Sequence, residues 1–229
     1  MKNDGQSGAD PSRTLSVTQR MAAICKQGIE GARVDGAGVT MIARDGTRLP
    51  VCSTDDLSTL VEELQVTLGQ GPCVDATATH APILVGDLAD PLEGVQQRWP
   101  IFQDEALRAG VRGVFAFPLG AGSSSLGTLD LYRRTPGPLD DSQLSHGLSA
   151  AEALGSTLLA QDSLGLAQEH MGTQMTVHRA AGMVMVQAGI SVEEALVLLR
   201  ATAYAEGTTV NKLAADVEEG RRRFSKERP

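Results

Sequence analysis

The sequence predicts an α+β protein, with an antiparallel sheet flanked by helices and an all-helical C-terminal part. Three patterns support this fold class. Short apolar segments between turn residues recur from residue 37 to residue 134, as expected for strands. Apolar residues at helical spacing precede and interrupt these segments. From Ser142 onward no proline occurs before the last residue, so this part of the chain can be continuously helical.

The N-terminal part begins with a polar segment, residues 1–14, which we expect to be disordered. Asp45-Gly46 is a strong hairpin signal between two strands. GQGP, residues 69–72, is expected to end a helix, and DPLEGVQQRWP is expected to be a loop. The predicted elements are a helix over 15–31, strands over 37–44 and 48–53, a helix over 57–68, a strand over 81–88, a helix over 101–110, and strands over 111–120 and 126–134.

A long helix is predicted from residue 142 to about residue 188, with Asp140 or Asp141 as its N-cap. Its apolar residues form a seam suited to pairing with another helix, as in a coiled coil. The seam consists of Leu144, Leu148, Ala151, Leu154 and Leu158.

Two shorter helices follow the long one. Gly189 ends the long helix, and Ser191 with Glu194 forms a capping box that opens a helix over 192–205. After Gly207, a last helix is expected over about 209–223. These helices are expected to close a small three-helix bundle at the end of the long helix.

Charge divides the chain into two unequal parts. The 229 residues carry a net charge of −8, but residues 171–229 hold eight Lys or Arg and seven Asp or Glu, a net of +1. The remainder, with a net of −9, is not expected to attract nucleic acid by itself. The three cysteines are widely spaced, which argues against a disulfide framework or a zinc site. No signal peptide or membrane-spanning run is present in the sequence, so we expect a soluble, cytoplasmic protein.

The C-terminal segment VHRAAGMVMVQAGISVEEALVLLRATAYAEGTTVNKLAADV resembles the ANTAR domain, a helical RNA-binding module of transcription antiterminators. One departure is Ala181, which stands where many members have lysine and removes one expected phosphate contact. The matching residues are Ala180, Gly182, Met183, Gly189, Ile190, Glu194, Ala195, Leu199, Arg200, Ala203, Leu213, Asp216 and Val217.

The preceding part resembles a GAF domain through LQVTLGQGPCVDA, PILVGDL, RWPIF, GVRGVFAFPL and LGTLDLY. That resemblance implies a sensor that binds a small molecule over the sheet or simply dimerises. Trp99 either lines such a pocket or packs as a cap. The predicted organisation is a tail over 1–14, a GAF-like domain over 15–141, a connecting helix over 142–170, an ANTAR-like domain over 171–224 and a tail over 225–229.

Candidate RNA-binding residues are those that the predicted bundle core does not use. Arg179, Arg200 and Lys212 are too polar for an apolar core. Ala181 and Gly182 are expected to leave bare helix surface beside Arg179, where a bulky partner can approach. The remaining candidates offer stacking or hydrogen bonds and are His178, Tyr204, Thr208, Thr209 and Asn211. The run from Arg221 to Arg223 either grips phosphate or is simply solvated.

The resemblance to the ANTAR domain implies an RNA-binding antitermination regulator that engages paired RNA stem-loops, and the leucine seam supplies a route to a dimer. A nearly neutral module should bind RNA weakly alone and better as two linked copies. Two alternatives remain: a DNA-binding helix-turn-helix protein that reads bases with Asn211 and Lys212, and a protein-binding dimer adaptor. The sequence holds no pattern for a catalytic site, so we expect neither an enzyme nor a cofactor, and a small-molecule effector stays unidentified.

Overall fold

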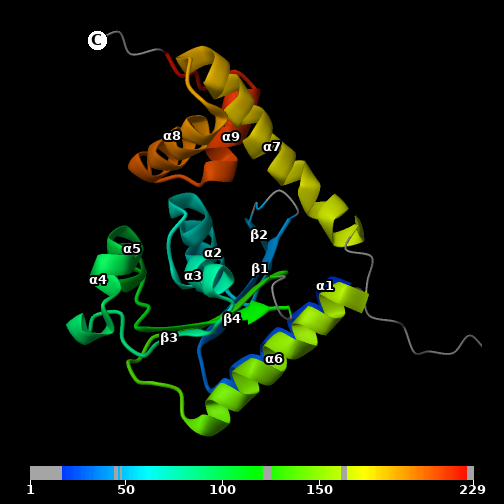
Figure 1. Cartoon of the computed structure of the whole chain (residues 1–229), viewed down its shortest axis with the longest axis vertical. Helices are drawn as coiled ribbons and strands as arrows, with labels where there is room; N and C mark the ends of the chain where they lie inside the picture. The colour runs from blue at the N-terminus through cyan, green and yellow to red at the C-terminus, as the bar shows by residue number, and fades with distance from the viewer. Residues whose placement is uncertain (1–16, 44–45, 47, 121–124, 161–163, 226–229) are drawn as a thin grey trace, which may run out of the picture.

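A five-stranded antiparallel sheet forms the centre of the N-terminal part (Figure 1). The computed structural model describes residues 17–43, 46, 48–120, 125–160 and 164–225, with the backbone alone for 160 and 164–175. The strand order is β2-β1-β5-β4-β3. The strands are β1 Gly36–Ile42, β2 Arg48–Ser53, β3 Ile83–Val85, β4 Gly113–Leu119 and β5 Gly127–Arg133.

Helices α1 (Val17–Ala32) and α6 (Asp141–Ala160) cover one face of this sheet (Figure 1). Asp140 caps α6, because the amide of Gln143 donates to its carboxylate at 2.8 Å. The two helices approach closely at Gly28, where an added Cβ would lie 3.2 Å from the Cβ of Ala150. One apolar cluster therefore joins α1, α6 and the sheet.

The opposite face carries shorter helices, and three of them form a second apolar cluster with the sheet. Trp99 lies in this cluster with 2 % of its surface exposed, and its ring meets that of Phe102 edge to face. Trp99 is thus a packed cap rather than part of an open pocket. The helices are α2 Asp56–Leu68, α3 Pro72–Thr79, η1 Pro91–Glu93, α4 Val95–Arg98 and α5 Pro100–Arg108.

The C-terminal part is a helical bundle of α7 (Leu164–Ala188), α8 (Val192–Ala205) and α9 (Val210–Glu218). The predicted capping box is present: the amide of Glu194 donates to Ser191 Oγ at 3.1 Å, and the amide of Ser191 donates to Glu194 at 2.7 Å. A third apolar cluster fills the bundle and contains Ala180, Ala181, Val184, Ala195, Leu199, Ala203, Val210, Leu213, Ala214 and Val217.

The predicted α+β fold class is confirmed, but several element limits differ. Helix α3 was not predicted: Gly69, with a left-handed φ of 65°, ends α2, and Pro72 fits the first turn of a new helix, where its missing N–H costs nothing. The expected loop over 90–100 contains η1 and α4. The last helix ends at Glu218 rather than near 223, because Gly220 adopts a left-handed φ of 75°.

Some predictions fall outside the described residues. These are the disordered tail over 1–14, most of the hairpin turn at Asp45-Gly46, and the continuity of the long helix across 161–163. The pairing of β1 with β2 on either side of that turn is as predicted.

Three of the five residues of the leucine seam pack inside the subunit. Ala151, Leu154 and Leu158 are buried in the cluster that joins α6 to α1 and the sheet. The expectation that these residues pair with a second chain is therefore wrong, since the sheet already buries them. Leu148 and Leu159, at 46 % and 67 % exposure, lie on the outer side of α6.

No single helix in the described part of the chain has the length and apolar composition to cross a membrane. The only candidate there is a pair, Thr176–Ala188 with Val192–Ala205, which meets that test together and is bent by 103°.

Replacing the buried Leu154 by alanine tests the internal role of the seam. Leu154→Ala should lower the free energy of unfolding by about 2–5 kcal/mol, because it leaves a cavity beneath α6. Leu159→Ala, on the exposed side of the same helix, should change it by no more than about 0.5 kcal/mol. Urea denaturation followed by circular dichroism measures both, and equal effects would contradict this packing.

Candidate nucleic-acid interface

The candidate residues form two groups on the C-terminal bundle, and the first surrounds the turn from α8 to α9. Gly207, with a φ of 60°, allows the chain to reverse after α8. Thr209 then caps α9, since its hydroxyl accepts from the amide of Lys212 at 3.2 Å. This turn brings together Arg200, Tyr204, Thr208, Thr209 and Lys212, with Asn211 partly buried beside them.

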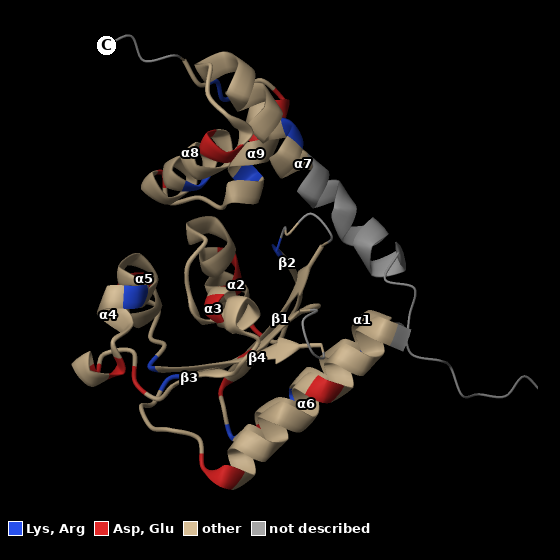
Figure 2. Cartoon of the chain, in the orientation of Figure 1, with Lys and Arg blue, Asp and Glu red and all other residues tan. Residues whose placement is uncertain are grey.

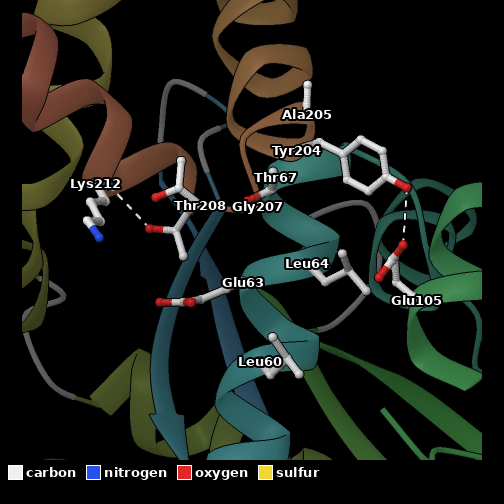
Figure 3. Close-up of a pocket in the computed structure, with 11 residues that line it drawn as sticks. Leu60, Glu63, Leu64, Thr67, Glu105, Tyr204, Ala205, Gly207, Thr208 and Lys212 are labelled. Atoms are coloured by element: carbon white, nitrogen blue, oxygen red, sulfur yellow. Dashed lines mark hydrogen bonds between the residues drawn. The ribbon is translucent and has the colours of Figure 1, made fainter. Parts of the chain in front are cut away.

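This first group borders the N-terminal domain, although Tyr204 and Lys212 keep exposed surface. A cavity of about 680 Å³ lies between the turn and helix α2 (Figure 3). The hydroxyl of Tyr204 donates to the Glu105 carboxylate of α5 at 3.1 Å. The lining residues are Leu60, Glu63, Leu64, Thr67, Glu105, Tyr204, Ala205, Gly207, Thr208, Thr209 and Lys212.

Arg200 lies at the same contact, beside the end of α2. Its guanidinium comes within 3.8 Å of the position that a Cβ on Gly69 would occupy. Burial lowers the pKa of Arg200, and the charge of Arg48 on β2 lowers it further. The contact between the two domains therefore holds two cations near each other, which weakens it electrostatically.

Apolar packing offsets part of this repulsion. Val66 of α2 packs against the apolar cluster of the bundle, with Leu196 and Leu198 at its edge. The contact thus combines a small apolar patch with the Tyr204–Glu105 hydrogen bond and a half-buried arginine. An association of this composition is weak enough to open and close.

The second group lies on α7 and α9. Arg179 donates to the carboxylate of Glu218, with the longer of its two bonds at 3.3 Å. Beside this pair a hollow of about 590 Å³ is bordered by Arg179, Gly182, Met183, Val186, Gln187 and Glu218. A Cβ on Gly182 would meet nothing within 4 Å, so the bare helix surface expected there exists.

Ala181 does not belong to that surface. It is fully buried in the apolar cluster of the bundle. Neighbouring residues on a helix point in different directions, so the side chain of Ala181 points away from the surface that Gly182 leaves bare. The expectation that Ala181 exposes bare helix is therefore wrong. His178 is partly buried on the same helix.

Acidic and basic residues are interspersed on the bundle instead of separated onto two faces (Figure 2). Arg221 pairs with Asp216 at 2.6 Å, and Arg222 pairs with Glu206 at 2.6 Å. Arg222 also lies over the Phe224 ring, 5.5 Å from its centre. These two arginines of the run thus bind acids of the bundle itself, so phosphate would have to compete for them.

The face of α2 that lines the cavity is not among the candidate residues identified from the sequence. Leu60, Glu63, Leu64 and Thr67 follow the i, i+3, i+4, i+7 spacing of one helix face. Leu60 is half exposed, so this stripe is not a core face. The spacing is visible in the sequence, but it does not tell which part of the chain covers the stripe.

The space between α2, α3 and the sheet is filled by buried polar side chains. Glu62 accepts hydrogen bonds from Thr40 and Tyr132, and burial raises its pKa. Asp130 lies nearby and accepts from Gln65 at 3.5 Å; burial and the charge of Glu62 raise its pKa well above the usual range. The protein's own side chains thus fill this layer over the sheet, where a small molecule would bind in the first of the two roles that the GAF resemblance implied.

Comparison with known proteins identifies the C-terminal domain. Residues 166–217 match the family model of the ANTAR domain. No curated protein matches the chain.

The remaining similarity is to solved structures. One is a domain of a proposed two-component sensor histidine kinase from Sinorhizobium meliloti 1021, with 19 % identity and a TM-score of 0.50, over 64 % of this chain and 93 % of that one. Another is the GAF domain region of a proposed membrane protein from Geobacter sulfurreducens PCA, with 14 % identity and a TM-score of 0.52, over 63 % and 94 %. The chain therefore carries an ANTAR domain at residues 166–217, preceded by a domain with the GAF fold.

Proposed function

We propose that this protein is an RNA-binding transcription antitermination regulator whose GAF-fold domain controls access to its ANTAR domain. The observation that carries the proposal is the position of Arg200, Tyr204 and Lys212, which lie in the ANTAR domain but face α2 and α5. Arginine and tyrosine side chains are suited to stack on unpaired RNA bases. Their contact with the sensor domain gives that domain a direct means of control.

RNA is favoured over duplex DNA by the composition of α9. A recognition helix in the major groove presents several polar side chains to base edges. In α9, Leu213, Ala214 and Val217 are buried in the bundle, and the acidic Asp216 and Glu218 occupy much of the rest. Only Asn211 and Lys212 remain to read bases, which is too few for a duplex site.

A homodimer suits the weak charge of the ANTAR domain, because two linked copies bind a tandem RNA through a high effective concentration. The buried seam residues Ala151, Leu154 and Leu158 cannot supply the dimer contact, but Leu148 of the same seam is exposed. Leu148 and Leu159 are eleven residues apart on α6, close to three full turns, and so share one outer face. We propose that this outer face of α6 pairs with its copy in the partner.

The GAF-fold domain and an RNA would compete for the same surface of the ANTAR domain. When α2 contacts the bundle, Glu63 and Glu105 line the cavity opposite Lys212, where RNA phosphates would otherwise lie. Carboxylates repel phosphates, so RNA binding requires the ANTAR domain to separate from α2. A signal that weakens this contact shifts the population toward the binding-competent state.

The dimer proposal predicts a preference for paired RNA hairpins. A two-hairpin RNA should bind at least about 10²-fold more tightly than either hairpin alone, because the second contact becomes intramolecular. Gel shifts at fixed salt measure this ratio, with a scrambled RNA and a matched duplex DNA as controls. Equal affinity for one and two hairpins would contradict the dimer, and tighter binding of the duplex would favour the DNA-binding alternative.

Lys212→Ala should weaken tandem RNA binding by removing one phosphate contact. The slope of log affinity against log salt should become shallower by about 0.7–1. Lys26→Ala removes the same charge from the exposed face of α1 and serves as the matched control. A salt titration of both variants by fluorescence anisotropy makes the comparison, and identical slopes would remove Lys212 from the interface.

Val66→Asn should increase RNA affinity, although Val66 belongs to the GAF-fold domain. A polar side chain at this position weakens packing against the bundle, and an allosteric coupling of this kind corresponds to about 5-fold or more in affinity. Leu92→Asn, at the fully exposed surface of the same domain, is the control and should leave affinity unchanged.

Hydrogen exchange of residues 206–212 gives an independent measure of separation. The amides of this turn should exchange faster in Val66→Asn than in the wild type. Faster exchange without tighter RNA binding would mean that the covered face is not the RNA-binding face.

A further inference from the structure

Two of the three cysteines meet on the face of the sheet opposite to α2. Cys25 is fully buried on α1, in the cluster that joins α1 and α6 to the sheet. Cys52 lies on β2, an edge strand, and is partly exposed while packing against the same cluster. The two thiols pack in one apolar cluster and lie close enough to shift each other's pKa. The wide spacing of the cysteines in the sequence gives no sign of this contact.

A β-bulge brings Cys52 to this face. Leu49 pairs with Met41 and Pro50 pairs with Thr40, but Cys52 pairs with Val39, so Val51 is an extra residue in β2. Without the bulge, strict alternation from the buried Leu49 would turn Cys52 toward α2. Because residues directly opposite in an antiparallel pair share a face, Cys52 points with Val39 toward α1.

The environments of the two thiols differ. The hydrogen bond to Cys52, and then burial, raise the pKa of Cys25, whereas the same hydrogen bond lowers the pKa of Cys52. Cys25 is therefore the thiol that keeps its proton, and Cys52 is the more accessible of the two. Thiolate character on the more accessible sulfur, next to a second thiol, is the arrangement of a reactive cysteine and its resolving partner.

We propose that Cys25 and Cys52 form a reversible intramolecular disulfide when the protein meets hydrogen peroxide. The Cys52 thiolate attacks one peroxide oxygen, the O–O bond breaks, and the released hydroxide takes up a proton to leave as water. The Cys25 sulfur then attacks the Cys52 sulfenic acid, giving up its proton as the S–O bond breaks and a second water leaves. Two thiols lose two electrons to peroxide, which yields one disulfide and two waters.

Such a bond would join α1 to the edge of the sheet. Because α1 packs against α6, which precedes the ANTAR domain along the chain, the disulfide would fix the layer from which that domain extends. This inference is independent of RNA binding, since it concerns only the GAF-fold domain.

Mass spectrometry of the full-length protein tests the proposal directly. Protein reduced with dithiothreitol, freed of reductant and treated with hydrogen peroxide should lose the mass of two hydrogen atoms, and proteolysis should yield one peptide pair linked through Cys25 and Cys52. Dithiothreitol should restore the original mass. A peroxide-treated protein that keeps both thiols, or links either one to a different cysteine, overturns the proposal.

Single substitutions resolve the order of the two steps. Cys25→Ser should stop the reaction at a sulfenic acid on Cys52 that dimedone captures, and Cys52→Ser should not react. Cys73→Ser is the matched control: Cys73 is fully buried on α3, and burial raises its pKa well above the ordinary value, so this variant should form the disulfide like the wild type. Loss of the Cys25–Cys52 link in Cys73→Ser, or dimedone capture only at Cys25 in Cys52→Ser, would contradict the proposed roles.

Discussion

Helix α2 is the element on which the rest of the structure depends, because it must satisfy three different environments at once. Val61 packs into the apolar cluster on one face of the sheet. Glu62 supplies the buried carboxylate for the hydroxyls of Thr40 and Tyr132. Val66, near the end of the helix, packs against the ANTAR domain. A change in the position of α2 would therefore alter the sheet, the buried polar layer and the contact with the ANTAR domain together.

The two faces of the sheet have different tasks. On the side of α2 and α3, buried polar groups fill the interior, and the cavity lies farther out, between α2 and the turn that joins α8 to α9. On the other side, α1 and α6 form an apolar layer that holds the contact between Cys25 and Cys52. The ANTAR domain is connected to both layers: it contacts α2 on one side, and it follows α6 along the chain (Figure 1).

Most secondary structure could be predicted because local patterns specify it. Asp45-Gly46 indicated the β1–β2 pairing, and Ser191 with Glu194 indicated the start of α8. Helix α3 was missed because Gly69 to Pro72 was interpreted only as the end of α2, whereas Pro72 also suits the first turn of a helix. The leucine seam was misassigned because its spacing shows that one side of α6 is buried, but not whether the sheet or a second chain buries it.

The candidate site divides in the same way. The sequence by itself determined the α+β fold class, the ANTAR domain and its polar candidates such as Arg179 and Lys212, since residue type and spacing are local properties. Only the tertiary structure decided that Ala181 is buried, that Arg200 and Tyr204 face α2, and that Cys52 meets Cys25. These outcomes depend on the rotation of α7, the docking of the bundle and a bulge in β2. Each is set by contacts between residues far apart in the chain, which no local pattern contains.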